Sequence, residues 1–152
     1  MTYDELLMQS DNEGLFVKEK PLSGNNGRIT GRRMAIRRNI PTTVEKACVL
    51  AEELGHYYTS AGNILDLSDI RNRKQELKAR MWAYNNQIGL IGLVRAFDHG
   101  CRNLPETADY LGVSEPFLAE ALEQYRQKYG ICATVDNYII YFEPNLRIGK
   151  MI

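Results

Sequence analysis

Leu50-Ala51-Glu52-Glu53-Leu54-Gly55-His56-Tyr57-Tyr58 carries the charged motif on which our prediction of the fold rests. It lies in a segment that opens with Pro41-Thr42-Thr43-Val44-Glu45, where Thr42 can cap a helix and Glu45 has capping-box spacing. Nothing interrupts a helix before Ser60-Ala61-Gly62. The residues at helical spacing that predict its buried stripe are Val44, Ala47, Ala51, Leu54 and Tyr58. We therefore predict one amphipathic helix that carries the charged motif in its second half.

The motif Glu52-Glu53-x-x-His56 has the spacing of a metal site on a helix. Side chains four residues apart lie about one turn apart on the same face, so Glu52 and His56 can converge on one ion. Glu53 projects between those levels, where it can act as general base toward a metal-bound water. This is the logic of the HExxH zinc-peptidase helix, with Glu52 in place of the first histidine. The same residues also suit a solvated glutamate pair followed by a histidine that caps the helix.

A second helical pattern runs from about Asp69 through Trp82 to Asn86. It supplies Glu76, a carboxylate that can close the site. Ala79 and Ala83 are small enough to let this helix approach its neighbour closely, and Trp82 can anchor it.

On these residues the chain resembles the ImmA/IrrE metallopeptidases. The resemblance rests on residues 50–58, where the family usually shows HELGH, and on Glu76-x-x-Ala79-x-x-Trp82-Ala83, which matches the family's second-helix pattern. It covers about Leu15 to Ile91. It implies a zincin-like metallopeptidase core, with His56 and Glu76 as zinc ligands and Glu53 as general base. Members of this family occur in phages, mobile elements and bacteria, where they cleave or otherwise relieve a repressor. The resemblance therefore implies a phage-type transcriptional repressor as the protein substrate.

The glutamate at position 52 changes the chemistry that we expect. A carboxylate oxygen can bind zinc, so the predicted ligand set is Glu52, His56 and Glu76. This set donates two negative charges where His-His-Glu donates one, so the metal should depress the pKa of its water less. We expect weak activity, a higher working pH, or Mn²⁺ in place of Zn²⁺. An anti-repressor that binds its partner without cutting it is the alternative.

Two tyrosines follow the predicted ligand His56. Tyr57 and Tyr58 can contact an oxyanion or the substrate at the edge of the site. They can also simply pack there and present a hydroxyl group. Both roles remain open from the sequence.

The segments before the motif helix predict a short helix and a small sheet. Thr2 and Glu5 have capping-box spacing, and the helix should break at Asp11-Asn12-Glu13-Gly14. Residues 15–20 and 28–40, separated by a turn at residues 23–27, predict a β-hairpin or two neighbouring strands. This pair is rich in cations: Lys18, Lys20, Arg28, Arg32, Arg33, Arg37 and Arg38. A basic strand edge favours an acidic stretch of a substrate added as a strand, although charged edges also protect against aggregation.

The C-terminal part of the chain predicts helices and a closing hairpin. The expected helices are Ile88–Asp98, Pro105–Leu111 and Ser114–Tyr129, and the hairpin spans residues 131–142. The last two helices and their turn at Gly112-Val113 resemble a helix-turn-helix, which makes a DNA-binding protein the second alternative. Glu115, Glu120 and Glu123 on the presumed reading helix disfavour phosphate contact. We favour a helical module that docks a protein or completes the core.

The composition is that of an ordinary globular protein. The 152 residues carry 19 basic and 19 acidic side chains, so no whole-chain charge indicates nucleic acid or membrane partners. The three cysteines are far apart, no apolar run approaches a membrane span, and the first residues do not resemble a secretory signal. We predict a cytoplasmic α+β zinc peptidase: a zincin-like core over residues 1–91 with a small sheet, and a helix-turn-helix-like region over residues 92–152 that packs on it and ends in a hairpin.

Overall fold

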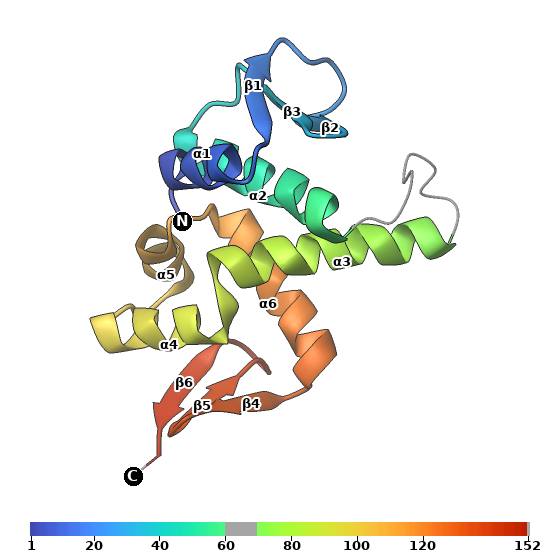
Figure 1. The fold of residues 1–152 in the computed structure, drawn as a ribbon. Helices are drawn as coiled ribbons and strands as arrows, with labels where there is room; N and C mark the ends of the chain where they lie inside the picture. The colour runs from blue at the N-terminus through green and yellow to red at the C-terminus, as the bar shows by residue number, and fades with distance from the viewer. Residues whose placement is uncertain (60–69, 152) are drawn as a thin grey trace. The chain divides into compact units, whose positions relative to one another are not determined.

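The computed structural model describes residues 1–59 and 70–151 as a mixed α+β protein (Figure 1). The chain forms two compact units, Met1–Asn86 and Gln87–Ile152. The boundary expected after residue 91 lies within a helix of the second unit, Gly89–His99.

The first unit contains three helices and three strands. They are α1 (Tyr3–Asn12), β1 (Phe16–Lys20), β2 (Gly27–Thr30), β3 (Arg33–Arg37), α2 (Thr43–Thr59) and α3 (Ile70–Gln87), whose last residue belongs to the second unit. The predicted start of α3 at Asp69 and the predicted stop of α2 at residues 60–62 lie outside the described residues.

Helix α1 begins with the predicted capping box. The Thr2 hydroxyl accepts a hydrogen bond from the Glu5 backbone N–H at 3.1 Å, and the Glu5 carboxylate accepts one from the Thr2 N–H at 3.0 Å. The helix runs on through Asn12, so the break predicted from Asp11 comes later than expected.

The sheet has the strand order β1-β3-β2, with β1 parallel to β3 and β2 antiparallel to β3. The predicted pairing was therefore wrong in one respect: residues 28–40 do not form one strand opposite β1, but contain a hairpin of their own. Thr30 pairs with Arg33 across a two-residue loop whose first residue, Gly31, has φ +59°. A loop this short needs left-handed backbone, which glycine adopts without strain.

One face of this sheet is buried and the other is exposed. Met34 and Ile36 in β3 are 2% and 0% exposed, while their neighbours Arg33 and Ala35 point the other way. Helix α2 contacts β2 and β3. The charged side chains of the strands therefore lie mainly on the opposite, exposed face of the sheet.

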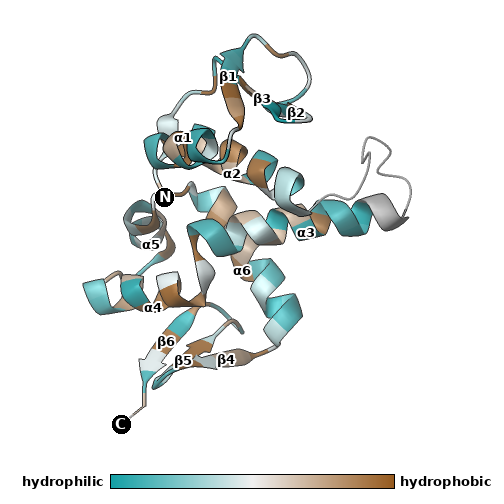
Figure 2. Cartoon of the chain, viewed as in Figure 1, coloured by the Kyte–Doolittle hydropathy of each residue, from teal (hydrophilic) through white to brown (hydrophobic). Residues whose placement is uncertain are grey.

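Helix α2 is capped by Thr42, whose hydroxyl accepts the Glu45 N–H at 3.1 Å, as predicted. Its buried stripe is partly different from the prediction: Val44 and Tyr58 are each 38% exposed, whereas Leu50 is fully buried. Figure 2 shows apolar and hydrophilic residues interleaved along this helix. The helix packs against α1 as well as the sheet, so its buried surface is wider than one stripe.

The second unit contains three helices and a three-stranded sheet. They are α4 (Gly89–His99), α5 (Leu104–Leu111), α6 (Glu115–Tyr129), β4 (Cys132–Val135), β5 (Tyr138–Tyr141) and β6 (Arg147–Lys150). Asn103 and Ser114 cap α5 and α6 through their side chains. The predicted closing hairpin is β4–β5, and β6 extends it to the antiparallel order β4-β5-β6. In the described part of the chain, none of the helices has the length and apolar character of a membrane span.

Candidate metal centre

The Glu53 carboxylate is buried between α2 and the edge strand β2. Glu53 is only 9% exposed. A Cβ atom added to Gly27, the first residue of β2, would lie 2.6 Å from Glu53 Oε1 and 2.8 Å from its Cγ. The strand can pass over this carboxylate only because position 27 has no side chain.

Helices α2 and α3 cross in close contact at Gly55. A Cβ atom at this position would collide with the backbone carbonyl of Ala79. Ala79 and Ala83 are both 0% exposed, which confirms that the small residues of α3 face a neighbour. Since Gly55 precedes His56 and Ala79 follows Glu76 by about one turn, this crossing brings the two predicted ligands together.

His56 and Glu76 form the polar centre of the crossing. His56 Nε2 lies 3.2 Å from Glu76 Oε2, and Arg80 Nε lies 3.3 Å from Glu76 Oε1. Only 13% of the His56 side chain and 23% of the Glu76 side chain are exposed. One carboxylate therefore joins an imidazole from α2 to a guanidinium from its own helix.

The surroundings of Glu53 and His56 shift the pKa of each toward the neutral form of its side chain. Burial, and then the charges of Glu52 and Glu76, raises the pKa of Glu53 to about 7. Burial lowers the pKa of His56, against the opposing effect of Glu76, and Arg80 lowers it further. A neutral imidazole is the form that binds a metal, and a carboxyl with a pKa near neutrality suits a general base.

The donor chemistry and spacing of His56 and Glu76 fit a zinc ion. The observed 3.2 Å is the distance of a hydrogen-bonded pair, and two ligands held tetrahedrally at about 2.0–2.1 Å from zinc also lie roughly 3.3 Å apart. His56 Nε2 faces Glu76, while Nδ1 of the same ring is buried and has no hydrogen-bond partner among the described residues. In metal sites this nitrogen usually donates to a carboxylate or carbonyl oxygen.

The third predicted ligand, Glu52, is not gathered with the other two. It is half-buried, and its charge acts on both Glu53 and Arg80. Yet no three His, Cys, Asp or Glu side chains of residues 1–59 and 70–151 converge closely enough to hold an ion. The structure thus brings together His56 and Glu76, and the charges of Glu52 and Glu76 both act on the buried Glu53.

The two tyrosines after His56 pack on one another and on α3. Their ring centroids are 5.1 Å apart at 79°, and the Tyr58 ring lies 5.1 Å from that of Trp82. This stacking gives Trp82 the anchoring contact that the sequence predicted for it. Tyr57 remains half-buried next to His56.

Two residues that shape the site did not emerge from the sequence as site residues. Gly55 looked like part of the motif only, although a glycine inside a helix costs about 1 kcal/mol relative to alanine and so indicates close packing. Gly27 was assigned to a turn, and nothing in the neighbouring sequence shows that a carboxylate lies against it.

Comparison with known proteins found no match among family models, curated sequences or solved structures.

Proposed function

We propose that this protein is a zinc-dependent peptidase with a zincin-like core and that Glu53 is its general base. The observation that carries the proposal is the position of Glu53. A buried carboxylate lies against Gly27 of the edge strand β2, three residues before His56 on the same helix, and His56 pairs with Glu76 at 3.2 Å. A hydrolytic site of this class needs a base, a metal and a place for an extended peptide, and residues suited to all three are adjacent here.

The residues of the chain have distinct roles in this proposal. His56 and Glu76 would hold the metal, with Glu52 turning in as the third ligand. The metal, when bound, would supply Lewis-acid polarisation of the peptide carbonyl. Glu53 would take a proton from the attacking water and pass it to the leaving amine. Arg80 holds the second oxygen of Glu76, which orients that carboxylate toward His56.

Strand β2 gives the substrate a place to bind. It is the last strand in the order β1-β3-β2, so one side of its backbone is an edge of the sheet. An extended peptide can add to such an edge by main-chain hydrogen bonds. Because Gly27 lies against Glu53, a peptide paired with β2 would run past the base. The proposed substrate is a phage-type repressor in the cytoplasm, as the resemblance to the ImmA/IrrE family implies.

Metal content is the measurement that tests the site most directly. Protein purified without chelator should contain about one zinc or manganese per chain. The double variant His56→Ala/Glu76→Ala should contain none, because both anchoring donors are lost. Elemental analysis by mass spectrometry measures both. A matched control is His99→Ala/Glu106→Ala, which removes a histidine and a glutamate from exposed positions of the second unit. If the native chain takes up no metal even after zinc is added, the hydrolase proposal is wrong.

Replacing Gly27 should impair catalysis more than stability. The Gly27→Ala methyl group would meet the Oε1, Cγ and Cδ atoms of the buried Glu53 side chain, so we expect the free energy of unfolding to fall by about 1–3 kcal/mol. We expect peptide hydrolysis to fall about tenfold or more, because a displaced base no longer reaches the water. Urea denaturation and cleavage of a quenched fluorescent peptide library measure the two effects. Thr30→Ala, an exposed change on the same strand, should alter neither.

The binding-only anti-repressor is the main alternative. It is favoured because no three metal-ligand side chains converge among the described residues. A Glu53→Gln chain that still relieves its repressor in full would establish that alternative.

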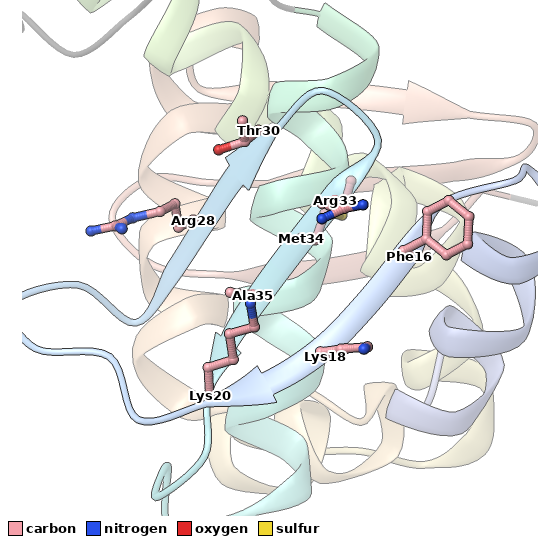
Figure 3. A pocket seen from close by; sticks show the side chains of 8 residues that line it. All are labelled: Phe16, Lys18, Lys20, Arg28, Thr30, Arg33, Met34 and Ala35. Atoms are coloured by element: carbon pink, nitrogen blue, oxygen red, sulfur yellow. The ribbon is translucent and has the colours of Figure 1, made fainter.

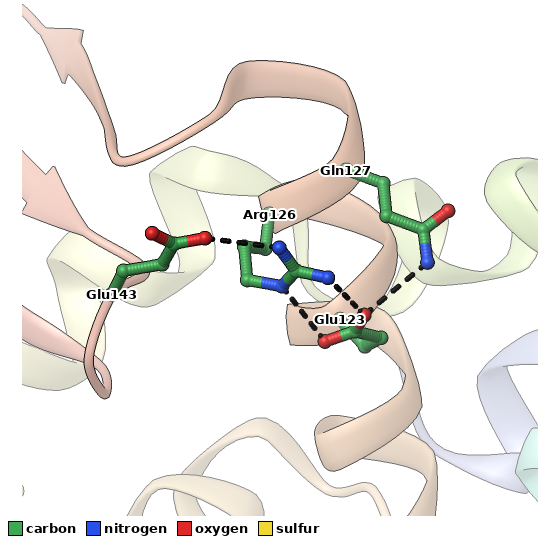
Figure 4. Close-up of polar contacts among 4 residues, drawn as sticks. All are labelled: Glu123, Arg126, Gln127 and Glu143. Atoms are coloured by element: carbon green, nitrogen blue, oxygen red, sulfur yellow. Dashed lines mark hydrogen bonds and ion pairs between the residues drawn. The ribbon is translucent and has the colours of Figure 1, made fainter.

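A DNA-binding role has less support. Arg126, a cation of α6, is held by Glu123 on the same helix and at 2.9 Å by Glu143 (Figure 4). Two carboxylates beside this guanidinium make the surface around it less favourable for phosphate.

A further inference from the structure

The sheet of the first unit has a basic outer face, which we define as Phe16, Lys18, Lys20, Arg28, Arg33 and Ala35. These side chains come from all three strands and, together with Thr30 and Met34, line a hollow of about 510 Å³ (Figure 3). The face lies on the side of the sheet opposite the buried side chain of Ile36. It is thus separate from the Glu53 site, and a ligand bound on it does not require the proposed peptidase activity.

All the charged side chains of the basic outer face are cations. The three strands contain one acidic residue, Glu19, and its alternation places it on the other side. Its carboxylate is engaged by Lys46 Nζ at 2.9 Å and by the Tyr3 hydroxyl at 2.9 Å. An ordinary solvated sheet face mixes both charges. Within these three strands, the outer face instead presents cations with no carboxylate to neutralise them.

The register of the strands places a cationic residue on each side of Ala35, a small residue in the central strand. Ala35 pairs with Lys18 on one side and with Arg28 on the other. With strands about 4.8 Å apart, the two cationic residues stand roughly 10 Å from each other across the alanine. An anionic group can therefore rest on Ala35 between two positive side chains. Arg37, which alternation places on the same side, also has a buried Nε without a hydrogen-bond partner among the described residues.

An exposed aromatic ring lies in the next row of the same face. Phe16 is 64% exposed, although a phenylalanine on a sheet normally gains by burial. It pairs with Arg33 on the neighbouring strand. A ring beside a guanidinium is a platform on which a nucleobase stacks, and a cationic groove beside it follows the phosphate backbone.

We propose that the basic outer face binds single-stranded nucleic acid, with a phosphate over Ala35 between Lys18 and Arg28 and a base on the ring of Phe16. An acidic peptide substrate is the other polyanion to consider. A peptide that adds to the sheet binds at an edge through its backbone, however, and does not need an exposed ring on the face. The combination of ring and cations on the face favours the nucleic acid.

Binding of a labelled oligonucleotide tests the proposal. The probe is a fluorescein-labelled oligodeoxythymidylate of about 12 nucleotides, and anisotropy is measured over a series of salt concentrations. Each phosphate contact on a single strand contributes about 0.7 to the slope of log affinity against log salt. Lys18→Glu/Arg28→Glu should therefore weaken binding and lower that slope by about 1.4. Phe16→Ala should weaken binding about tenfold, while Phe16→Tyr should bind like the native chain.

The controls distinguish this proposal from general charge attraction. Arg95→Glu/Arg102→Glu makes the same change of charge at exposed positions of the second unit and should leave the affinity unchanged. Circular dichroism should show all variants folded. The proposal is wrong if the native chain does not bind the oligonucleotide, or if Phe16→Ala binds as tightly as the native chain. It is also wrong if a polyglutamate peptide of equal charge binds as tightly, since the face would then accept acidic protein segments.

Discussion

Glu53→Gln should abolish peptide hydrolysis and at the same time make the metal-free protein more stable at pH 8. Loss of a general base costs about 10²–10⁴-fold in rate, because glutamine cannot accept the proton of the attacking water. The gain in stability has a separate origin. The buried carboxylate has its pKa raised from 4.5 to about 7, so keeping it ionised in the fold carries a free-energy cost.

The direction of this pH dependence is set by the two pKa values of Glu53. Below pH 4.5 the carboxyl is protonated in both the folded and the unfolded chain, and it has no effect on stability. Between 4.5 and about 7 it ionises first in the unfolded chain, so the free energy of unfolding falls as the pH rises. Above that range the loss is complete, at about 3 kcal/mol for a shift of this size. A neutral glutamine avoids the loss altogether.

Thermal unfolding of chelator-treated protein at pH 4 and at pH 8 measures this difference. Glu53→Gln should match the native chain at the lower pH and exceed it at the higher. Glu13→Gln, which changes an exposed carboxylate of the same unit, should behave like the native chain at both. Equal stability of Glu53→Gln and the native chain at pH 8 would show that the Glu53 carboxylate is not held in a buried position.

Gly55→Ala should destabilise the protein by about 3 kcal/mol or more and abolish the proposed metal binding. In an exposed helix this substitution would stabilise by up to about 1 kcal/mol, since alanine is the better helix former. Here the added methyl group meets the carbonyl of Ala79, which is backbone and cannot rotate away. The helices must separate, and the contact between His56 and Glu76 depends on their crossing.

Urea denaturation and metal analysis together measure the effect of Gly55→Ala. Gly149→Ala is the matched control, because a Cβ atom there meets nothing within 4 Å. It should change neither stability nor metal content. A Gly55→Ala chain as stable as the native one would mean that α2 and α3 are not in close contact at this point.

The sequence predicted local structure better than pairing. The caps by Thr2 and Thr42 and the turn between the last two helices depend on neighbouring residues, and these predictions are confirmed. The pairing of β1 was harder to predict because it depends on long-range contacts. The tight loop at Gly31 makes β2 and β3 a hairpin, and it is β3, the second strand of that hairpin, that pairs with β1. Local patterns do not encode such contacts. Strand β6 was missed because only Ile148 among its four residues is a typical strand former, the others being two cations and a glycine.

In the candidate site, too, the sequence predicted the local features but not the long-range contacts. Helical spacing placed Glu52 and His56 on one face, and the small residues of α3 correctly indicated close approach to a neighbour. The approach of Gly27 to Glu53 is a long-range contact, visible only once the sheet is in place. Convergence of three ligands is a matter of side-chain rotamers, which spacing on a helix does not fix. For this reason the role of Glu52 stays a prediction.

The burial of Glu53 also bears on how long a chain survives in the cell. Without a metal, the ionised carboxylate lowers the population of the native state at neutral pH, and proteases act on the unfolded fraction. A bound cation would neutralise that charge and add its own binding energy to the fold. Turnover of the protein would then depend on the supply of the ion, so that copies without metal are removed before they can occupy a partner unproductively.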